Sequence, residues 1–236
     1  MFIDFNKKFI FLKTLKTGGT SISKMIRDQY TPINDKKEFH GFKFFKENAV
    51  QIRKKANFLD SSLHTGHISI EQIKKYFIND ISGYYIFSNV RNPYEVELSR
   101  ILYLKKLKDK MGSNFKDLTF SHNLKRMTAS YFYNNKYFFS LFIKNSRPFN
   151  FVCLDNGKDI SHDHIRLENF NEDWKMICDK IDLEYHQPLH LNSNKKSYDS
   201  FEFKKLFNKK NISLINKKYS TIISKNGYQV PERFQK

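Results

Sequence analysis

The chain has 236 residues, a length that can bury a sizeable core and that suits one large domain better than two small ones. Its 42 Lys and Arg against 24 Asp and Glu give a formal net charge of +18, so we expect an anionic partner. The chain contains no zinc-finger, basic-zipper or RNA-recognition pattern, so nucleic acid is not the expected partner. Cys153 and Cys178 are too few for a disulfide framework and are expected in the core. We predict a single domain over residues 1–236.

The N-terminal segment predicts no membrane anchor. Its short apolar run is interrupted by charge, is too short for a transmembrane helix and has no clear cleavage site. A reducing cytoplasm is therefore the expected location. The many lysines suit a solvated surface, and they also suit peripheral contact with anionic lipid. Charge alone does not identify the partner.

The first part of the chain predicts a strand, a tight loop and a helix. The continuously apolar run Phe9–Leu12 suits a strand that is buried on both faces of a parallel sheet. The glycine pair Gly18-Gly19 follows, and then apolar residues at helical spacing: Ile22, Met25, Ile26 and Tyr30. Such a unit commonly binds a phosphate at the start of its helix.

A second unit of the same kind begins at Tyr84. Tyr84–Val90 reads as a strand, and the polar loop Arg91–Pro93 leads into a helix that begins near Pro93. Ser69 with Gln72 forms a weak capping-box pattern for a short helix between the two units, over Gln72–Phe77. This pattern predicts that His67 lies just before the helix.

The remaining segments continue the alternation of strands and helices. Phe151–Leu154 is a further strand candidate, and an amphipathic stripe from Phe170 to Ile181 predicts a helix. A similar stripe near the C-terminus ends at Gly227, a plausible helix stop. The stretch 35–55 receives no assignment. The pattern favours an α/β protein with a three-layer, P-loop-like fold, in which helices flank a central parallel sheet.

The segment Lys16–Ser21, with the sequence KTGGTS, carries the strongest chemical signal. Glycines let the backbone N–H groups approach an anion, the helix N-terminus adds positive potential, and the ammonium and hydroxyl groups supply further donors. The alternative is an ordinary glycine turn that begins a helix, which leaves the lysine and the three hydroxyl groups unexplained. We predict a phosphate cradle.

The order of residues in this segment separates it from the loops of nucleotide-hydrolysing enzymes. Those loops place a glycine before the lysine, whereas here Lys16 precedes Gly18 and Gly19. The second strand also ends in Ser88–Arg91 without the carboxylate that could hold magnesium. Both features favour group transfer without a metal.

The two phosphate motifs together resemble those of the sulfotransferases that use 3'-phosphoadenosine-5'-phosphosulfate (PAPS). The resemblance rests on Lys16–Ser21, on Val90–Glu95 and on Ser99, and it is closest to the glycan 2-O-sulfotransferases, the carbohydrate sulfotransferases and their bacterial relatives. Supporting similarities are Gly66-His67, Arg166–Phe170 and Leu189–Ser193. The similarity spans Phe9–Tyr228, and it implies transfer of a sulfuryl group from PAPS to a hydroxyl, most simply of a carbohydrate.

Three positions depart from the family pattern. Leu15 stands where the family usually has proline, which predicts a looser start of the loop. Ser220 stands near the place of a frequent acidic residue, so a role that depends on that acid is in doubt. Thr65 replaces a second histidine, and His64 lies one place earlier.

The resemblance implies a role for each residue of the donor site. Lys16 would lie beside the oxygen that bridges phosphorus and sulfur, where negative charge grows as the S–O bond breaks. The 5'-phosphate would also be held by Thr17, Gly18, Gly19, Thr20 and Ser21. Arg91 and Ser99 would bind the 3'-phosphate, for which a guanidinium is well suited. The alternative for Arg91 is a surface ion pair with Glu95.

His67 is the predicted general base. A hydroxyl needs to lose its proton to become a good nucleophile, and a histidine with a pKa near neutrality commonly accepts it. The Gly66-His67 pair resembles the catalytic motif of the 2-O-sulfotransferases. A purely structural role for His67 and a substitution by His64 are the alternatives.

Two other functions remain open. A P-loop kinase or NTPase would use ATP and magnesium, and a non-catalytic basic protein would bind nucleic acid with a steep dependence on salt. The acceptor of a sulfotransferase also stays open, because no feature distinguishes a glycan or glycolipid head group from a small metabolite or a protein tyrosine.

Overall fold

The computed structural model describes residues 1–32, 42–52, 67–111, 136–187 and 205–235. They form a mixed α/β fold in two compact units, each assembled from two separate stretches of sequence. The first unit comprises Met1–Arg91 and Phe149–Asn192, and the second comprises Asn92–Pro148 and Ser193–Lys236. A single domain over residues 1–236 stays a prediction.

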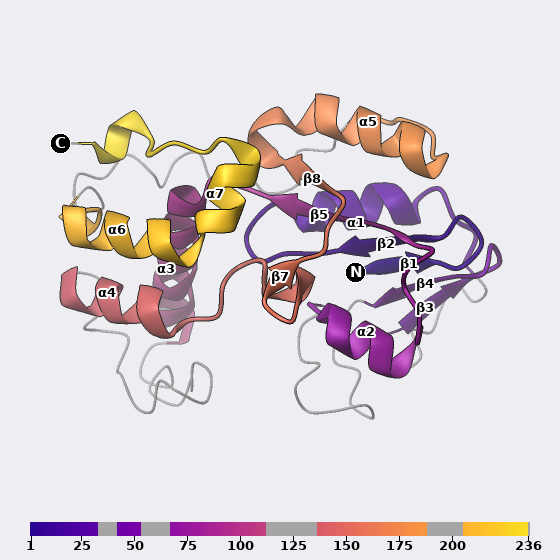
Figure 1. The fold of residues 1–236 in the computed structure, drawn as a ribbon, viewed down its shortest axis with the longest axis horizontal. Coiled ribbons are helices and arrows are strands. Elements are labelled where there is room, and N and C mark those ends of the chain that lie inside the picture. The colour runs from indigo at the N-terminus through magenta and orange to yellow at the C-terminus, as the bar shows by residue number, and fades with distance from the viewer. Residues whose placement is uncertain (33–41, 53–66, 112–135, 188–204, 236) are drawn as a thin grey trace. The chain divides into compact units, whose positions relative to one another are not determined.

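A six-stranded sheet forms the centre of the first unit (Figure 1). Its strands lie in the order β3-β4-β1-β2-β5-β8. Their bounds are β1 Phe2–Asp4, β2 Phe9–Leu12, β3 Phe42–Phe45, β4 Ala49–Ile52, β5 Tyr85–Val90 and β8 Asp163–Arg166. Strands β2, β5 and β8 are parallel, whereas the other three neighbouring pairs are antiparallel. The predicted central parallel sheet is therefore correct for three strands only, and the sheet is mixed.

Short connections explain the antiparallel half of the sheet. Residues 5–8 join β1 to β2, and residues 46–48 join β3 to β4. A crossover between parallel strands needs about a dozen residues, so each of these pairs can only form a hairpin. Strands β3 and β4 lie in the stretch 35–55 that the sequence analysis left unassigned.

Helices cover both faces of this sheet, which gives the first unit three layers (Figure 1). Helices α1 (Gly19–Arg27) and α5 (Phe170–Ile181) pack on the face that includes the side chains of Phe9 and Phe11. Helix α2 (Ile70–Tyr76) packs on the opposite face, which includes Ile10 and Leu12. Because successive side chains of a strand point to opposite faces, this arrangement buries the whole of β2 and explains its unbroken apolar sequence.

Several local predictions are confirmed. Helix α2 begins two residues earlier than expected, at Ile70, and Ser69 and Gln72 form both hydrogen bonds of a capping box. Helix α3 begins at Pro93. Gly227 ends the last α-helix in the left-handed conformation, with φ of 67°.

The strand expected at Phe151–Leu154 is wrong for most of its length. Residues Phe151–Cys153 form a 3-10 helix, η3, and only Leu154–Asp155 (β6) is extended. Strand β6 pairs with β7 (Lys158–Asp159) in a separate two-stranded hairpin. The turn is Asn156-Gly157, where both residues have positive φ. An Asn-Gly pair is a strong hairpin signal in a sequence.

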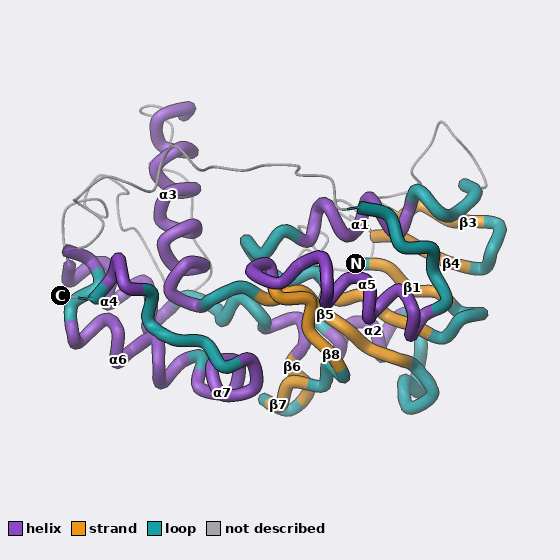
Figure 2. The backbone as a smooth tube through the Cα atoms, turned by 90° about the horizontal axis from the view of Figure 1, so that it is seen from above, coloured by secondary structure: helices purple, strands orange, loops and turns teal. Residues whose placement is uncertain are grey.

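The second unit is helical in its described part. Its elements are α3 Pro93–Met111, α4 Lys136–Asn145, α6 Lys209–Lys218, α7 Ser220–Asn226 and the 3-10 helix η7 Glu232–Phe234. Helices α4 and α6 lie side by side, and α3 crosses them (Figure 1, Figure 2). The C-terminal stripe predicted as one helix is divided at Tyr219, which ends α6 and precedes α7.

Both cysteines are free and buried, as expected of core residues. Within the described ranges, no helix combines the length and the apolar character that a membrane span requires.

The core of the first unit depends on Trp174, the chain's one tryptophan, which is fully buried between α5 and the sheet. Trp174→Ala should lower the free energy of unfolding by about 3–5 kcal/mol because it leaves a large cavity. Trp174→Phe keeps part of the apolar contacts and leaves a smaller cavity, so it should cost clearly less than Trp174→Ala. Urea unfolding followed by circular dichroism measures both. Equal losses in the two variants would contradict this account, and Met176→Ala, on the exposed side of α5, is the control.

Candidate anion-binding site

The predicted phosphate loop and Arg91 follow neighbouring parallel strands of the first unit. In the sheet register, Leu12 of β2 is opposite Ser88 of β5, and Val90 of β5 is opposite Arg166 of β8. The three strands therefore end at the same edge of the sheet. Open α/β sheets commonly bind ligands at the carboxyl ends of their strands, so this edge is the candidate site.

The loop after β2 has the backbone shape of an anion cradle. Lys16 and Gly18 have positive φ, 63° and 83°, and Thr17 between them does not. Such an alternation turns successive backbone N–H groups toward one concave side. Gly18 is the N-cap of α1, and no side chain caps this helix end. The first N–H groups of α1 thus add to the donors of the cradle.

Buried Asn89, at the end of β5, holds this loop from beneath. Its Oδ1 accepts a hydrogen bond from the Thr14 N–H at 3.2 Å, and its Nδ2 donates to the Thr17 carbonyl at 2.8 Å. Nδ2 also contacts the Thr17 hydroxyl, and the Thr14 hydroxyl donates to the Asn89 carbonyl. The two threonine hydroxyls lie 2.6 Å apart. The protein's own hydrogen bonds therefore define the shape of the cradle.

Some of the predicted phosphate ligands are buried in the protein's own hydrogen bonds, whereas others are at least partly exposed. The side chain of Thr17 is buried against Asn89 and stabilises the loop, so its backbone N–H is the group left to meet an anion. Ser21 is also buried, and its N–H donates to the Gly18 carbonyl at 3.0 Å. Thr20 is exposed, and Lys16 is half-buried.

Both glycines of the loop are required by close packing. A Cβ atom on Gly18 would lie 3.0 Å from Cδ1 of Leu167, in addition to the strain of a positive φ. A Cβ atom on Gly19 would lie 2.7 Å from Cγ of Lys13 and 3.1 Å from both amide atoms of Asn89. Larger residues would therefore displace the side chains that shape the cradle.

Leu15 does not loosen the start of the loop as the sequence analysis expected. Its backbone N–H donates to the Phe149 carbonyl at 3.1 Å. A proline has no N–H and could not form this bond. The departure from the family pattern thus adds a hydrogen bond that holds the loop.

Lys13 belongs to the site although sequence reasoning gave it no role. Its Nζ donates to Oγ1 of Thr20 at 3.2 Å, which places a second ammonium group, besides that of Lys16, in the loop. The available signal was its position directly after the buried strand β2.

His67 contacts the same residue through its ring. Its Nδ1 lies 2.7 Å from the carbonyl oxygen of Lys13. Because a carbonyl only accepts, Nδ1 carries the proton in the neutral ring, and Nε2 is the basic atom. Burial lowers the pKa of His67 to about 4, and the positive charge of Lys13 adds to this effect, whereas the hydrogen bond to Lys13 opposes it. His67 is therefore neutral at pH 7, with a pKa below the near-neutral value we expected. His64 and Thr65 lie outside the described residues.

The two residues predicted to bind a 3'-phosphate belong to different units. Arg91 is half-buried at the end of the first unit, and Ser99 is buried on α3 of the second. Glu95, the alternative partner of Arg91, accepts a hydrogen bond from Arg233. Among the supporting motifs, Arg166 forms a bidentate ion pair with Asp173 at 2.7 Å and 2.8 Å. Leu189–Ser193 lies outside the described residues.

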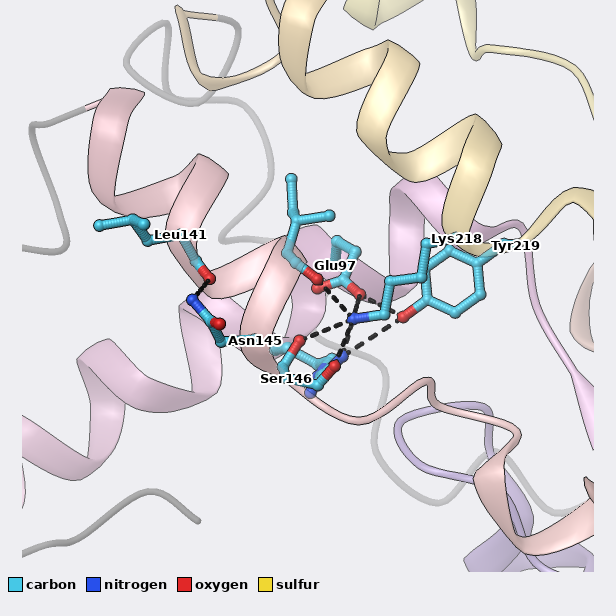
Figure 3. Close-up of polar contacts among 8 residues, drawn as sticks. Glu97, Leu141, Asn145, Ser146, Lys218 and Tyr219 are labelled. Atoms are coloured by element: carbon cyan, nitrogen blue, oxygen red, sulfur yellow. Dashed lines mark hydrogen bonds and ion pairs between the residues drawn. The ribbon is translucent and has the colours of Figure 1, made fainter. Parts of the chain in front are cut away.

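The helix that carries Ser99 is anchored by a buried charge cluster in the second unit (Figure 3). Fully buried Glu97 accepts hydrogen bonds through Oε1 from the Tyr219 hydroxyl and, at 2.9 Å, from Arg100. Nζ of Lys218 lies 4.0 Å from the same oxygen and donates to the Ile143 and Ser146 carbonyls at 2.7 Å. Burial lowers the pKa of Lys218 to about 8, although Glu97 opposes the shift. The cluster links α3 to α4 and α6.

The comparisons with family models, with curated proteins and with solved structures each found no match. Among the residues that the structure describes, no group of His, Cys, Asp and Glu side chains is arranged to hold a metal ion.

The account of the loop predicts that Asn89→Asp is strongly destabilising. The new oxygen would replace a donor that faces the Thr17 carbonyl, and at least two buried hydrogen bonds would be lost. Each buried group left without a partner costs about 1–3 kcal/mol, so thermal or urea unfolding should show a loss of at least about 2 kcal/mol. Asn171→Asp, an exposed position in the first turn of α5, is the control and should change stability by less than about 0.5 kcal/mol. A loss no larger than the control's would refute the role of Asn89.

The low pKa of His67 predicts a loss of stability in acid. The folded pKa of about 4 is below the ordinary value of 6.5, so the unfolded chain binds the proton first and stability falls as the pH drops through this window. His67→Asn can still donate to Lys13 but does not titrate. The unfolding free energy of the variant should therefore fall by about 2 kcal/mol less than that of the wild type between pH 6.5 and 4.5. An equally large fall in the variant and in the wild type would contradict the assignment of this acid sensitivity to His67.

Proposed function

We propose that this chain is a sulfotransferase that moves a sulfuryl group from PAPS to a hydroxyl of an acceptor, with a carbohydrate as the favoured acceptor class and the cytoplasm as the location. The observation that carries the proposal is the backbone cradle at Lys16–Gly18, which continues into the uncapped N-terminus of α1 and is held by Asn89. It coincides with the motif KTGGTS, on which the family resemblance rests.

The proposed step breaks one bond to sulfur and forms another. The acceptor oxygen attacks sulfur, the bond from sulfur to the bridging oxygen breaks, and its electron pair stays on the phosphate. Lys16 stabilises the charge that grows on this oxygen, and the backbone N–H groups from Thr17 to Thr20 hold the 5'-phosphate. The acceptor proton passes to Nε2 of His67, whose neutral state and fixed tautomer suit a base.

One feature supports sulfuryl transfer over the use of ATP and magnesium. Asn89 stands at the end of β5, where a nucleotide-hydrolysing enzyme could supply a carboxylate to the metal, and its amide is already engaged with the loop. The family resemblance assigns the 3'-phosphate, the group that distinguishes PAPS from ATP, to Arg91 and Ser99.

The donor product, adenosine 3',5'-bisphosphate, provides the first test. At about 100 times its Kd, it should add about 2.7 kcal/mol to the unfolding free energy and raise the melting temperature. Adenosine 5'-monophosphate at the same concentration should have a much smaller effect. A shift with ATP and magnesium but none with the bisphosphate would replace the proposal with a kinase or NTPase, and a preference for nucleic acid over both would favour a non-catalytic binder.

Lys16→Ala separates chemistry from binding in the same enzyme. Turnover of PAPS with a panel of glycan acceptors, followed by the mass gain of sulfate, should fall by about 10²–10³-fold, because the lost charge acts mainly in the transition state. Binding of the bisphosphate should weaken far less. Lys175→Ala, on the exposed side of α5, is the matched control. Normal turnover in the Lys16 variant would remove this residue from the mechanism.

A further inference from the structure

The second unit contains a groove that the proposed sulfuryl transfer does not use. It has a volume of about 810 Å³ and lies between the N-terminal end of α6, the chain segment that follows α7, and Ser140 of α4. Pockets of about 300–1,000 Å³ are the usual size for sites that bind small organic molecules. All of its lining residues belong to the second unit.

One wall of the groove is aromatic and rigid. Phe207 and Phe234 stack with their ring centroids 4.0 Å apart and an angle of 16° between the ring planes. Phe139 packs edge-on against Phe207, with the centroids 5.3 Å apart. Half-buried Ile212 and Val230 extend the apolar lining. Because Phe207 and Phe234 are almost completely buried, they support the groove from below, and an apolar group in the groove would pack against Ile212 and Val230.

Hydrogen bonds hold the groove open in its present shape. Nδ2 of fully buried Asn211 donates to the Leu206 carbonyl at 2.8 Å, and the amide oxygen of Asn211 accepts from the buried Ser140 hydroxyl. On the other side, Nδ2 of Asn92 donates to the Gln229 carbonyl at 2.8 Å. Nε2 of Gln235 donates to the Val230 carbonyl at 2.7 Å. The site is therefore built before any ligand arrives, which reduces the entropy lost on binding.

The rim of the groove is cationic. Lys209 and Lys210 line it and are exposed at the first two positions of α6. Asn208 caps the N–H of Asn211, and the earlier N–H groups of the helix have no carbonyl within the helix to bond. No acidic residue lines the groove, and the stretch 203–231 contains lysines but no Asp or Glu. The local field thus favours an anionic group.

We propose that this groove binds an amphipathic anion, whose apolar body lies against Ile212 and Val230 and whose phosphate, sulfate or carboxylate meets Lys209 and Lys210. The two parts of such a ligand match the two surfaces of the groove, and neither a neutral apolar molecule nor a bare anion would use both. The site is distinct from the donor cradle, and it does not depend on sulfuryl transfer. Its natural ligand is either a soluble metabolite or a lipid with an anionic head group.

The test compares three probes on the full chain by isothermal titration calorimetry. 1-Naphthyl phosphate should bind at least tenfold more tightly than 1-naphthol or inorganic phosphate. Lys209→Ser/Lys210→Ser should weaken its binding by about tenfold or more, since a hydrogen bond to a charged group contributes about 1.5–3 kcal/mol. Lys144→Ser/Lys175→Ser removes the same charge from exposed positions outside the groove and should leave binding unchanged. Equal effects of the two double variants would overturn the proposal.

A second variant tests the apolar half of the site. Val230→Ser should weaken the binding of 1-naphthyl phosphate by several fold and leave that of inorganic phosphate unchanged, and its melting temperature reports whether the fold is kept. In the wild type, the probe should shift the amide resonances of residues 207–212 and 229–235. If the probe does not bind, or if adenosine 3',5'-bisphosphate displaces it from these residues, the proposal is wrong.

Vesicles identify the source of the ligand. If the lipid is the natural source, vesicles of phosphatidylcholine that contain phosphatidylserine should bind the wild type and the Lys144/Lys175 double variant but not the Lys209/Lys210 double variant. If a soluble metabolite is the source, the vesicles should not bind, while 1-naphthyl phosphate still does. Both results support the site, and binding of vesicles by all three proteins would show a general attraction to charge and count against it.

Discussion

The candidate site depends on one buried side chain, the amide of Asn89. A loop that presents its N–H groups to an anion has to satisfy its other polar groups elsewhere, because buried groups without partners are costly. Asn89 meets this requirement for Thr14 and Thr17 with a donor and an acceptor on one rigid group. It comes from β5, the parallel neighbour of the strand that leads into the loop. The sheet register thereby determines the shape of the cradle.

The same arrangement explains the electrostatics around the loop. The Lys13 carbonyl orients His67, and the Lys13 ammonium reaches Thr20 and adds to the low pKa of the histidine. Thus one residue links the predicted base to the predicted phosphate site. A histidine kept neutral by burial can accept a proton at physiological pH, although it is a weaker base than an ordinary histidine. In the proposed reaction, such a weak base would accept the acceptor's proton late, when the bond between sulfur and the bridging oxygen is already breaking.

The second unit differs from the first in that its helical core contains buried charged groups. Glu97 is fully buried, and its charge is compensated by Arg100, the Tyr219 hydroxyl and nearby Lys218. Removing one partner of such a cluster usually costs more than the cluster contributes, because a charge is left buried. The cluster therefore ties α3, which carries Ser99, to α4 and α6. On α6, buried Asn211 does the same for the groove with neutral hydrogen bonds.

The sequence by itself determined the local elements on either side of the loop. The apolar run Phe9–Leu12 and the glycine pair predicted a strand, a cradle and a helix, because these signals act over a few neighbouring residues. The mixed sheet was missed although short connections implied it, and so was the hairpin turn at Asn156-Gly157. These are errors of interpretation rather than missing information.

Other features were decided only by the tertiary structure. Asn89 joins the site through strand pairing between residues that are far apart in sequence, and no local pattern distinguishes it from other polar residues. The low pKa of His67 comes from burial, which the sequence does not specify for a single histidine. The groove arises because the C-terminal segment folds back beside the start of α6, so that Phe234 meets Phe207. Propensity and spacing depend on neighbouring residues in the sequence, whereas these contacts depend on how distant segments of the chain pack together.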